Sequence, residues 1–130
     1  LTSKITIVIP TFEMINNSLI LSQSSILLLG ITYKENCPDS RNTKIPEVFN
    51  ILKKQDADVS VYDPKASPEE IKNKYNIDLT TELKQYDGII LAVGHSEFGE
   101  IDFTKLKKNS NSVLFDVKSF LNKENVDARL

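Results

Sequence analysis

The segment of residues 30–42, GITYKENCPDSRN, holds the side chains best suited to bind a ligand. Its two cations, Lys34 and Arg41, lie on one loop just before a predicted helix, and together they can hold a phosphate or a pyrophosphate. The alternative is that both cations pair with Glu35 or Asp39 on a solvated surface, where such pairs are common. Residue spacing alone leaves both interpretations open.

The loop lacks the glycine-rich signatures of phosphate binding. The G-x-G-x-x-G fingerprint brings the backbone close to a pyrophosphate, but this loop contains only Gly30. Asp63 ends a predicted strand, where a dinucleotide-binding domain places the carboxylate for a ribose hydroxyl. It follows Gly30 by 33 positions, more than the ~20 typical of that motif. We therefore expect Asp63 to cap the turn before Pro64.

Cys37 and His95 are the single cysteine and the single histidine. One cysteine excludes an internal disulfide, and a zinc site would have to take ligands from elsewhere, so we expect no metal. His95 follows a predicted strand, where a general base can stand. No orienting partner lies at a recognisable spacing, and we expect a loop or packing histidine.

From residue 25 onward, short apolar runs alternate with amphipathic stretches, which is typical of a mainly parallel sheet. The predicted strands are residues 26–29, 59–62, 88–93 and 113–115. The predicted helices are residues 43–55, a short helix from Ser67, a turn near 81–86 and a short helix capped by Asp102. These elements predict a doubly wound, Rossmann-like α/β fold of three α/β/α layers, with four or five parallel strands.

Two of the helices have recognisable start signals. In the helix over 43–55, apolar residues recur at i, i+3, i+4 and i+7, and Asn42 or Thr43 is available as the N-cap. Ser67 followed by Pro68 starts the second helix.

The two ends of the chain fit this pattern less well. Residues 1–24 alternate like a strand and then, after Pro10, follow a helical spacing; we interpret them as a connecting arm or truncation remnant, and 25–130 as the domain. Residues beyond Lys118 have the composition of a polar tail. The lysines near the last predicted helix are expected on a solvated face: Lys105, Lys107 and Lys108.

The composition fits one soluble domain. The 130 residues include 16 basic and 18 acidic side chains, and this balance argues against sequence-independent nucleic-acid binding. An anionic ligand must then be held by a few local groups. No apolar run approaches the ~20 residues that span a bilayer, and no signal peptide is recognisable. We expect a cytoplasmic protein.

Residues 30–43 closely resemble the loop of the UDP-binding C-terminal domain in the UDP-glucose/GDP-mannose dehydrogenase family. The segments 61–64, 86–98 and 115–118 are similar to the same family in the same order. The form KENCPD resembles the branch that acts on UDP-N-acetylhexosamines of the galactosamine or mannosamine type more than the UDP-glucose branch. The resemblance covers about 25–130.

This resemblance implies that Tyr33, Lys34 and Lys118 contact a UDP-sugar, and that Arg41 reaches an NAD held mainly by a partner domain. The family oxidises the C6 alcohol of the sugar to a carboxylate, for cell-surface polysaccharides, through a thiohemiacetal on a cysteine. That chemistry needs a glycine-rich N-terminal domain and a central catalytic segment, and we recognise neither here. Cys37 corresponds to a loop cysteine, so we expect it to be structural and no residue of this chain to be catalytic.

Other interpretations remain. A homodimer is possible, but the family dimerises mainly through its central segment, so the domain alone could be a monomer. A non-catalytic receiver-like or interaction module is an alternative function. A receiver needs acidic residues after its first strand and a phosphoacceptor aspartate after its third, whereas this sequence has Gly30-Ile31 and Gly94-His95 there. A self-sufficient small Rossmann enzyme lacks both its fingerprint and a catalytic constellation.

Overall fold

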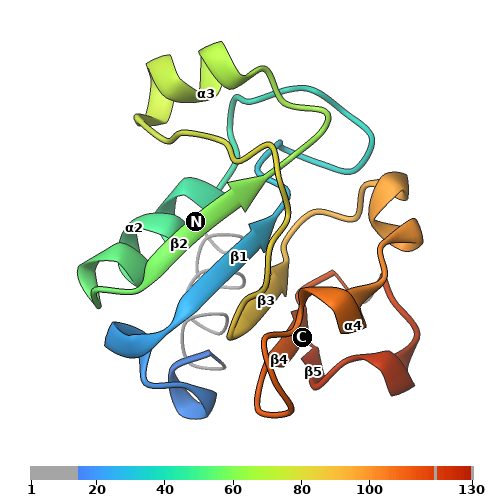
Figure 1. Cartoon of the computed structure of the whole chain (residues 1–130). Coiled ribbons are helices and arrows are strands. Elements are labelled where there is room, and N and C mark those ends of the chain that lie inside the picture. Colours follow the sequence, from blue (N-terminus) through green and yellow to red (C-terminus); the bar gives the residue numbers. More distant parts are fainter. Residues whose placement is uncertain (1–14, 119, 130) are drawn as a thin grey trace.

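The computed structural model describes residues 15–118 and 120–129 of the chain (Figure 1). Its sheet has five parallel strands in the order β2-β1-β3-β4-β5. The strands are β1 (Ser25–Leu29), β2 (Asp58–Tyr62), β3 (Gly88–Leu91), β4 (Val113–Asp116) and β5 (Ala128–Arg129). The helices are α2 (Ile45–Lys54), α3 (Pro68–Tyr75) and α4 (Phe103–Leu106), with 3-10 helices η1 (Leu21–Gln23), η2 (Ser96–Glu100) and η3 (Lys123–Asn125). The predicted doubly wound α/β fold is confirmed.

β1 lies between β2 and β3, and Leu28 pairs in register with Val61 on one side and Ile90 on the other. Residues 26–29 are fully buried. A strand covered on both faces needs a continuous apolar run, which is why this one was recognisable in the sequence. Its even-numbered residues join one core cluster and its odd-numbered residues the other, because successive side chains of a strand point to opposite faces.

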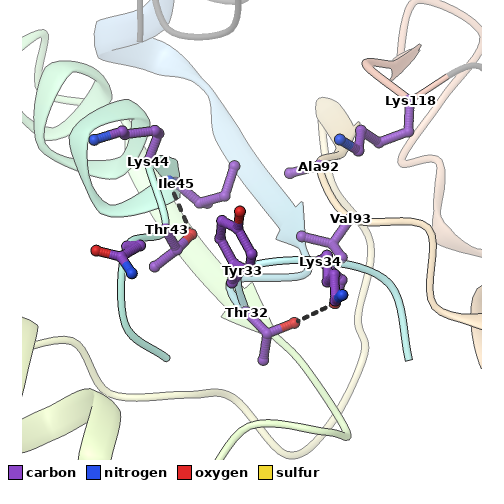
Figure 2. Close-up of a pocket in the computed structure, with 10 residues that line it drawn as sticks. Thr32, Tyr33, Lys34, Thr43, Lys44, Ile45, Ala92, Val93 and Lys118 are labelled. Carbon is purple, nitrogen blue, oxygen red and sulfur yellow. Dashed lines mark hydrogen bonds between the residues drawn. The ribbon is translucent and has the colours of Figure 1, made fainter. Parts of the chain in front are cut away.

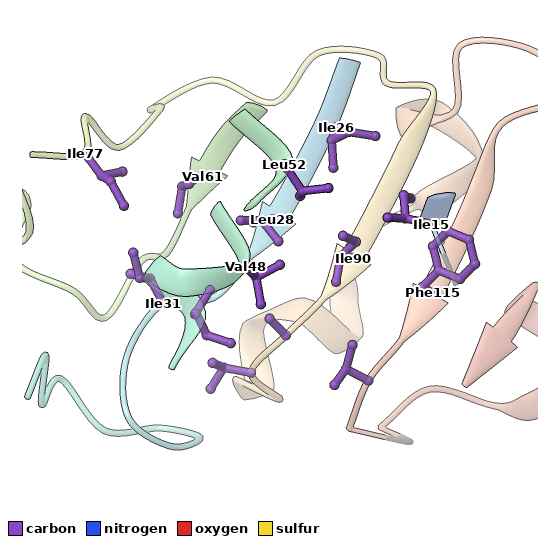
Figure 3. Close-up of a cluster of buried hydrophobic side chains, with 14 of the residues drawn as sticks. Ile15, Ile26, Leu28, Ile31, Val48, Leu52, Val61, Ile77, Ile90 and Phe115 are labelled. Atoms are coloured by element: carbon purple, nitrogen blue, oxygen red, sulfur yellow. The ribbon is translucent and has the colours of Figure 1, made fainter. Parts of the chain in front are cut away.

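The first core cluster fills the face covered by α2, α3 and residues 15–21 (Figure 3). Leu52 of α2 and Ile71 of α3 are fully buried on this face. The apolar stripe of α2 therefore faces the sheet, as its 3.6-residue spacing predicts.

The second cluster fills the opposite face, below η2 and α4. Phe98 of η2 and Leu106 of α4 pack there against the odd-numbered residues of β1 and against Ile89 and Leu91 of β3. Helical elements thus cover both faces of the sheet. Within the described residues, no helix is long and apolar enough to cross a bilayer.

The starts of the two longer helices differ. Ser67 accepts a hydrogen bond from the amide three residues on, at 3.3 Å, and caps α3 as predicted. α2 begins at Ile45, and its N-cap position is Lys44, which makes no side-chain capping bond. Pro46 has no N–H to offer a cap, so Thr43 accepts instead from the amide of Ile45, at 3.3 Å. The prediction of Asn42 or Thr43 at the N-cap position was therefore wrong.

The predicted helical turn near 81–86 is absent: residues 81 and 82 form a bend, residues 83–85 have no regular structure, and Tyr86 forms an isolated bridge with Lys107. The amide of Tyr86 donates to the carbonyl of Leu106 at 2.8 Å, and Leu79 forms a parallel bridge with Val61. These backbone groups pair with neighbouring elements instead of closing a turn of their own.

The chain beyond Lys118 is more than a polar tail, because it adds η3 and β5 to the fold. Asp127 accepts a hydrogen bond from the amide of Leu114 at 2.6 Å, and Leu121 and Val126 pack on the second cluster. Two apolar residues and one aspartate are enough to dock this short segment.

Of the three lysines predicted on a solvated helix face, Lys105 is exposed on α4 as predicted, whereas the other two are placed differently. α4 ends at Leu106, so Lys107 and Lys108 lie beyond it. Lys107 forms an ion pair with Asp127 at 3.2 Å, and Lys108 forms one with Asp87 at 3.1 Å. They tie the end of α4 to the edges of neighbouring strands.

The described part of the N-terminal arm packs against the domain. Ile15 and Leu21 belong to the first core cluster, and a Cβ added at Gly88 would lie 2.9 Å from the side chain of Ile15. Residues 1–14 lie outside the described residues. The proposed boundary between an arm of 1–24 and a domain of 25–130 stays a prediction.

Candidate functional site

A cavity of about 320 Å³ opens at the carboxyl edge of the sheet, where ligands bind in folds of this type. It lies between the loop after β1, the start of α2 and the segments that follow β3 and β4 (Figure 2). The predicted substrate contacts Tyr33, Lys34 and Lys118 all line it. The fold thus brings together residues that lie up to 85 positions apart in the chain.

The cations around this cavity are available to an anion. Within the described residues, Lys34 and Lys118 form no ion pair. Lys118 reaches toward Ala92 from the segment after β4 (Figure 2). α2 begins at Ile45 in the cavity wall and directs the positive end of its dipole there. Among the described residues that line the cavity there is no carboxylate, thiol or imidazole, so the lining is suited to bind a phosphate group.

Tyr33 adds an aromatic ring to this cationic wall. Its side chain is 53% exposed, which is unusual for a large ring in a folded domain. The backbone around it is nevertheless fixed, because the amide of Tyr33 donates to the carbonyl of Asp39 at 2.8 Å and closes the loop on itself.

Gly30 allows the loop after β1 to pass close to the end of β3. Its φ of +99° is one that residues with a side chain rarely adopt, and a Cβ there would lie 2.6 Å from the Cβ of Val93. β3 itself ends at Leu91, earlier than predicted, because the amides of Ala92 and Val93 both turn to the carbonyl of Leu29, at 2.9 and 3.2 Å.

Asp63 connects the turn after β2 to the loop after β1. Its Oδ1 accepts from the amides of Lys65 and Ala66 at 2.8 and 3.2 Å, which confirms the predicted turn cap. Its Oδ2 accepts from the amides of Ile31 and Thr32 at 2.7 and 3.1 Å, and its side chain is fully buried. The carboxylate therefore fixes the first residues of the site loop.

His95 has the orienting partner that the sequence did not show. Its Nε2 lies 3.0 Å from Asp63 Oδ2 and 3.1 Å from Thr32 Oγ1, and its Nδ1 accepts from the amide of Asn36 at 2.9 Å. The imidazole is fully buried. Burial by itself raises the pKa of Asp63, but hydrogen bonds from His95 and from the amide of Ile31 outweigh it and leave that pKa below its ordinary value.

The far half of the loop is attached to α3 through Ser40. Its hydroxyl lies 3.0 Å from Glu70 Oε1 and 2.9 Å from the amino group of Lys74. The hydroxyl of Tyr75 donates to its carbonyl. The loop is therefore held at both ends, by the Asp63 and His95 cluster and by α3.

Arg41 does not line the cavity. Its guanidinium pairs with Asp39 through two hydrogen bonds of 3.0 and 3.2 Å, and its side chain is 75% exposed. These hydrogen bonds lower the pKa of the Asp39 carboxyl. The surface pairing considered for both loop cations thus holds for Arg41, whereas Lys34 remains available.

Cys37 is a half-buried free thiol outside the cavity lining. Among residues 15–118 and 120–129, no group of three or more histidine, cysteine or acidic side chains could hold a metal ion.

Comparison with known proteins identifies the domain. Residues 27–123 match the family model of the UDP-glucose/GDP-mannose dehydrogenase family, UDP binding domain. The chain is 42% identical over 122 residues to UDP-N-acetyl-D-glucosamine 6-dehydrogenase of Salmonella typhi, which covers 90% of this chain and 28% of that protein. It is 36% identical over 124 residues to Protein CapL of Staphylococcus aureus, over 91% of this chain and 29% of that protein. The chain thus spans less than a third of the length of these relatives.

Solved structures confirm the fold. The native structure of the UDP-N-acetyl-mannosamine dehydrogenase Cap5O from Staphylococcus aureus superposes with a TM-score of 0.68 at 22% identity, over 97% of this chain and 30% of that one. The NDP-N-acetyl-D-galactosaminuronic acid dehydrogenase from Methanosarcina mazei Go1 superposes with a TM-score of 0.72 at 20% identity, over 88% of this chain and 25% of that one. The receiver-like alternative is therefore not favoured. The chain belongs to the UDP-glucose/GDP-mannose dehydrogenase family and is its UDP-binding domain.

Proposed function

We propose that this chain is the UDP-sugar-binding part of an NAD-dependent UDP-N-acetylhexosamine 6-dehydrogenase, which oxidises the C6 alcohol of the sugar to a carboxylate for polysaccharide synthesis. The observation that carries the proposal is the cavity at the carboxyl edge of the sheet, where Tyr33 meets Lys34 and Lys118. Lys34 and Lys118, which form no ion pair within the described residues, and the N-terminus of α2 match the charge of a diphosphate.

The substrate class is supported by the pattern of identities. Relatives named as UDP-N-acetyl-D-glucosamine 6-dehydrogenases are 42% and 41% identical to this chain. The relative named UDP-glucose 6-dehydrogenase from Rhizobium meliloti is 27% identical. We therefore place the substrate among the UDP-N-acetylhexosamines and leave its epimer open.

The three predicted contacts have distinct parts in this proposal. Lys34 and Lys118 approach the cavity from different loops and bind the diphosphate with charge-assisted hydrogen bonds. Tyr33 packs its exposed ring and hydroxyl against the nucleotide. A volume of about 320 Å³ is at the low end of the ~300–1,000 Å³ typical of ligand pockets, as expected of one wall of a larger cleft.

The described residues do not fit a dinucleotide site of their own. The loop after β1 has a single glycine, and Asp63, which stands where a ribose-binding carboxylate would, is fully buried under backbone amides. NAD would therefore be held mainly by residues outside this chain. Arg41 is this chain's proposed contribution, because its exposed guanidinium lies on the site loop but outside the cavity.

The test is a titration of the purified chain with UDP, UDP-N-acetylgalactosamine and NAD, followed by NMR and calorimetry. We expect saturable binding of both uridine ligands, with shifted amide signals in residues 33–41, and no saturable binding of NAD. Lys54→Ala serves as a control variant, because Lys54 is exposed at the far end of α2, away from the cavity. It should bind the uridine ligands as the unchanged chain does. No response to UDP at millimolar concentration would refute the proposed site in this chain.

A further inference from the structure

A buried cluster beside the cavity connects the loops that follow β1, β2 and β3. Asp63 follows β2, Thr32 follows β1 and His95 follows β3, and their side chains meet within 3.1 Å. β1 lies between the other two strands, so Asp63 and His95 approach the start of the site loop from opposite sides. Of these three residues, Thr32 lines the cavity, whereas Asp63 and His95 do not.

The hydrogen bonds around His95 select one tautomer. Its Nδ1 faces the N–H of Asn36, so this nitrogen must accept and carries no proton. Its Nε2 faces the carboxylate of Asp63, so the proton is on Nε2. Thr32 Oγ1 gives its own proton to the carbonyl of Lys34 and can accept from the same Nε2–H. Every polar atom of the imidazole is then satisfied.

The imidazole holds the loop on both sides of Lys34. Thr32, two residues before, contacts Nε2 and holds the carbonyl of Lys34 at 3.2 Å. Asn36, two residues after, donates its amide to Nδ1 and accepts from the amide of Ser96 through Oδ1, at 2.9 Å. Asn36 has a φ of +56°, in the left-handed region. Its two hydrogen bonds hold the loop in this conformation.

We propose that His95 is a positioning residue, which Asp63 orients so that its Nδ1 holds Asn36 and thereby presents Tyr33 and Lys34 to the diphosphate of the substrate. This inference rests on the proposed function of the cavity. Among the described residues, the imidazole of His95 forms hydrogen bonds with Thr32, Asn36 and Asp63, of which Thr32 alone lines the cavity. It therefore acts through the loop and not on the ligand.

Two substitutions separate the halves of the imidazole. In His95→Asn, the amide oxygen takes the place of Nδ1 and can still accept from Asn36, while the bond to Asp63 is lost. In His95→Gln, the longer amide can still donate to Asp63, while the bond to Asn36 is lost. The two variants therefore carry side chains of similar polarity, but His95→Asn keeps the contact with the loop and His95→Gln keeps the contact with the carboxylate.

The decisive measurement is UDP affinity by calorimetry beside the urea midpoint of each variant. We expect His95→Asn to bind UDP within about twofold of the wild type, and His95→Gln to bind roughly tenfold more weakly, the scale of one lost hydrogen bond. Stability should rank the opposite way, with His95→Gln the more stable. The positioning role is overturned if the less stable variant is also the one that binds UDP more weakly. It is also overturned if neither variant changes the UDP affinity.

NMR of the ligand-free chain tests the positioning of the loop without relying on UDP binding. The ring nitrogen signals should show an unprotonated Nδ1 and a protonated Nε2 at neutral pH, and the amide signals of Tyr33 and Lys34 should move in His95→Gln and stay in His95→Asn. If the wild type fails to bind UDP, the proposed function fails for this chain, and these signals decide the positioning role. A protonated Nδ1, or loop amides unmoved in His95→Gln, overturns it.

Discussion

At the scale of single residues, Asp63 carries the most hydrogen bonds near the site. Its two oxygens accept from four backbone amides and from His95, and its side chain is fully buried. An acceptor-only group fits this position because all its neighbours are donors. A buried donor without a partner is costly, which makes this carboxylate essential to the loop.

Asp63→Asn should destabilise the chain by about 2–4 kcal/mol, because the new NH₂ group faces amide donors and leaves some of them unpaired. Urea denaturation measures the loss. Asp58→Asn is the matched control, because Asp58 is an exposed aspartate at the start of β2 and its substitution should change stability by less than about 0.5 kcal/mol. Equal effects of the two substitutions would contradict the role given to Asp63.

The depressed pKa of Asp63 also predicts a pH dependence. Its ordinary value is 3.8, and the folded value lies below that. The carboxylate therefore contributes its full stabilisation above the unfolded pKa, and this contribution is lost as the pH falls through the folded pKa. The midpoint of urea denaturation would be measured at several buffer pH values from about 5.5 down to about 2.5. As the pH falls, this midpoint should decrease more steeply for the wild type than for Asp63→Asn. If the midpoints of the two proteins fall in parallel, Asp63 is not the source of the acid sensitivity.

The two cations of the site loop, Lys34 and Arg41, can be tested one at a time. Lys34→Ala should weaken UDP binding by about 1–3 kcal/mol, the loss expected for a charge-assisted hydrogen bond. Arg41→Ala should leave UDP binding nearly unchanged, because Arg41 is paired with Asp39 outside the cavity. Calorimetry of both variants decides, and a large UDP defect in Arg41→Ala would show that the two cations share one ligand.

At the scale of elements, the sequence predicts what local patterns control. The strands buried on both faces appear as continuous apolar runs, and α2 and α3 appear through their spacing and the Ser67 cap. The segment 81–86 was misassigned because the backbone partners of Tyr86, at Leu106 and Lys108, lie elsewhere in the chain. β5 has two residues and docks through β4 and Asp127, so it leaves no periodic signal of its own.

Gly30→Ala tests whether the close approach of the backbone after β1 to Val93, after β3, leaves room for a side chain. The φ of +99° and the 2.6 Å approach to Val93 both oppose a side chain, so the substitution should cost more than about 2 kcal/mol of stability and also weaken UDP binding. Gly99→Ala is the control, because its added Cβ would meet only the ring of Phe120, at 3.7 Å. Urea denaturation compares them, and a small effect at Gly30 would mean that the loop relaxes easily.

At the scale of the whole molecule, topology explains which site residues could be found in advance. Tyr33, Lys34 and Lys118 were predicted as substrate contacts by resemblance, and the shared edge of a parallel sheet brings them into the lining of one cavity. The pairing of His95 with Asp63 was not foreseen, because 32 positions separate them and only the strand order β2-β1-β3 places them across the same loop. A contact of this kind has no signature in residue spacing.

The same scale yields a prediction about specificity. The chain spans 28% of its relative from Salmonella typhi. Its cavity of about 320 Å³ presents lysines and an aromatic ring, with a few small polar side chains beside them. If the hexosamine is recognised mainly by residues outside this chain, UDP, UDP-glucose and UDP-N-acetylgalactosamine should bind to it with dissociation constants within about threefold, less than 1 kcal/mol apart. Calorimetry at one salt concentration gives the three values. A UDP-N-acetylhexosamine that binds more than tenfold tighter than UDP would show that this domain itself grips the sugar, and the search for specificity residues would then begin at Asn42 and Thr43 in the cavity wall.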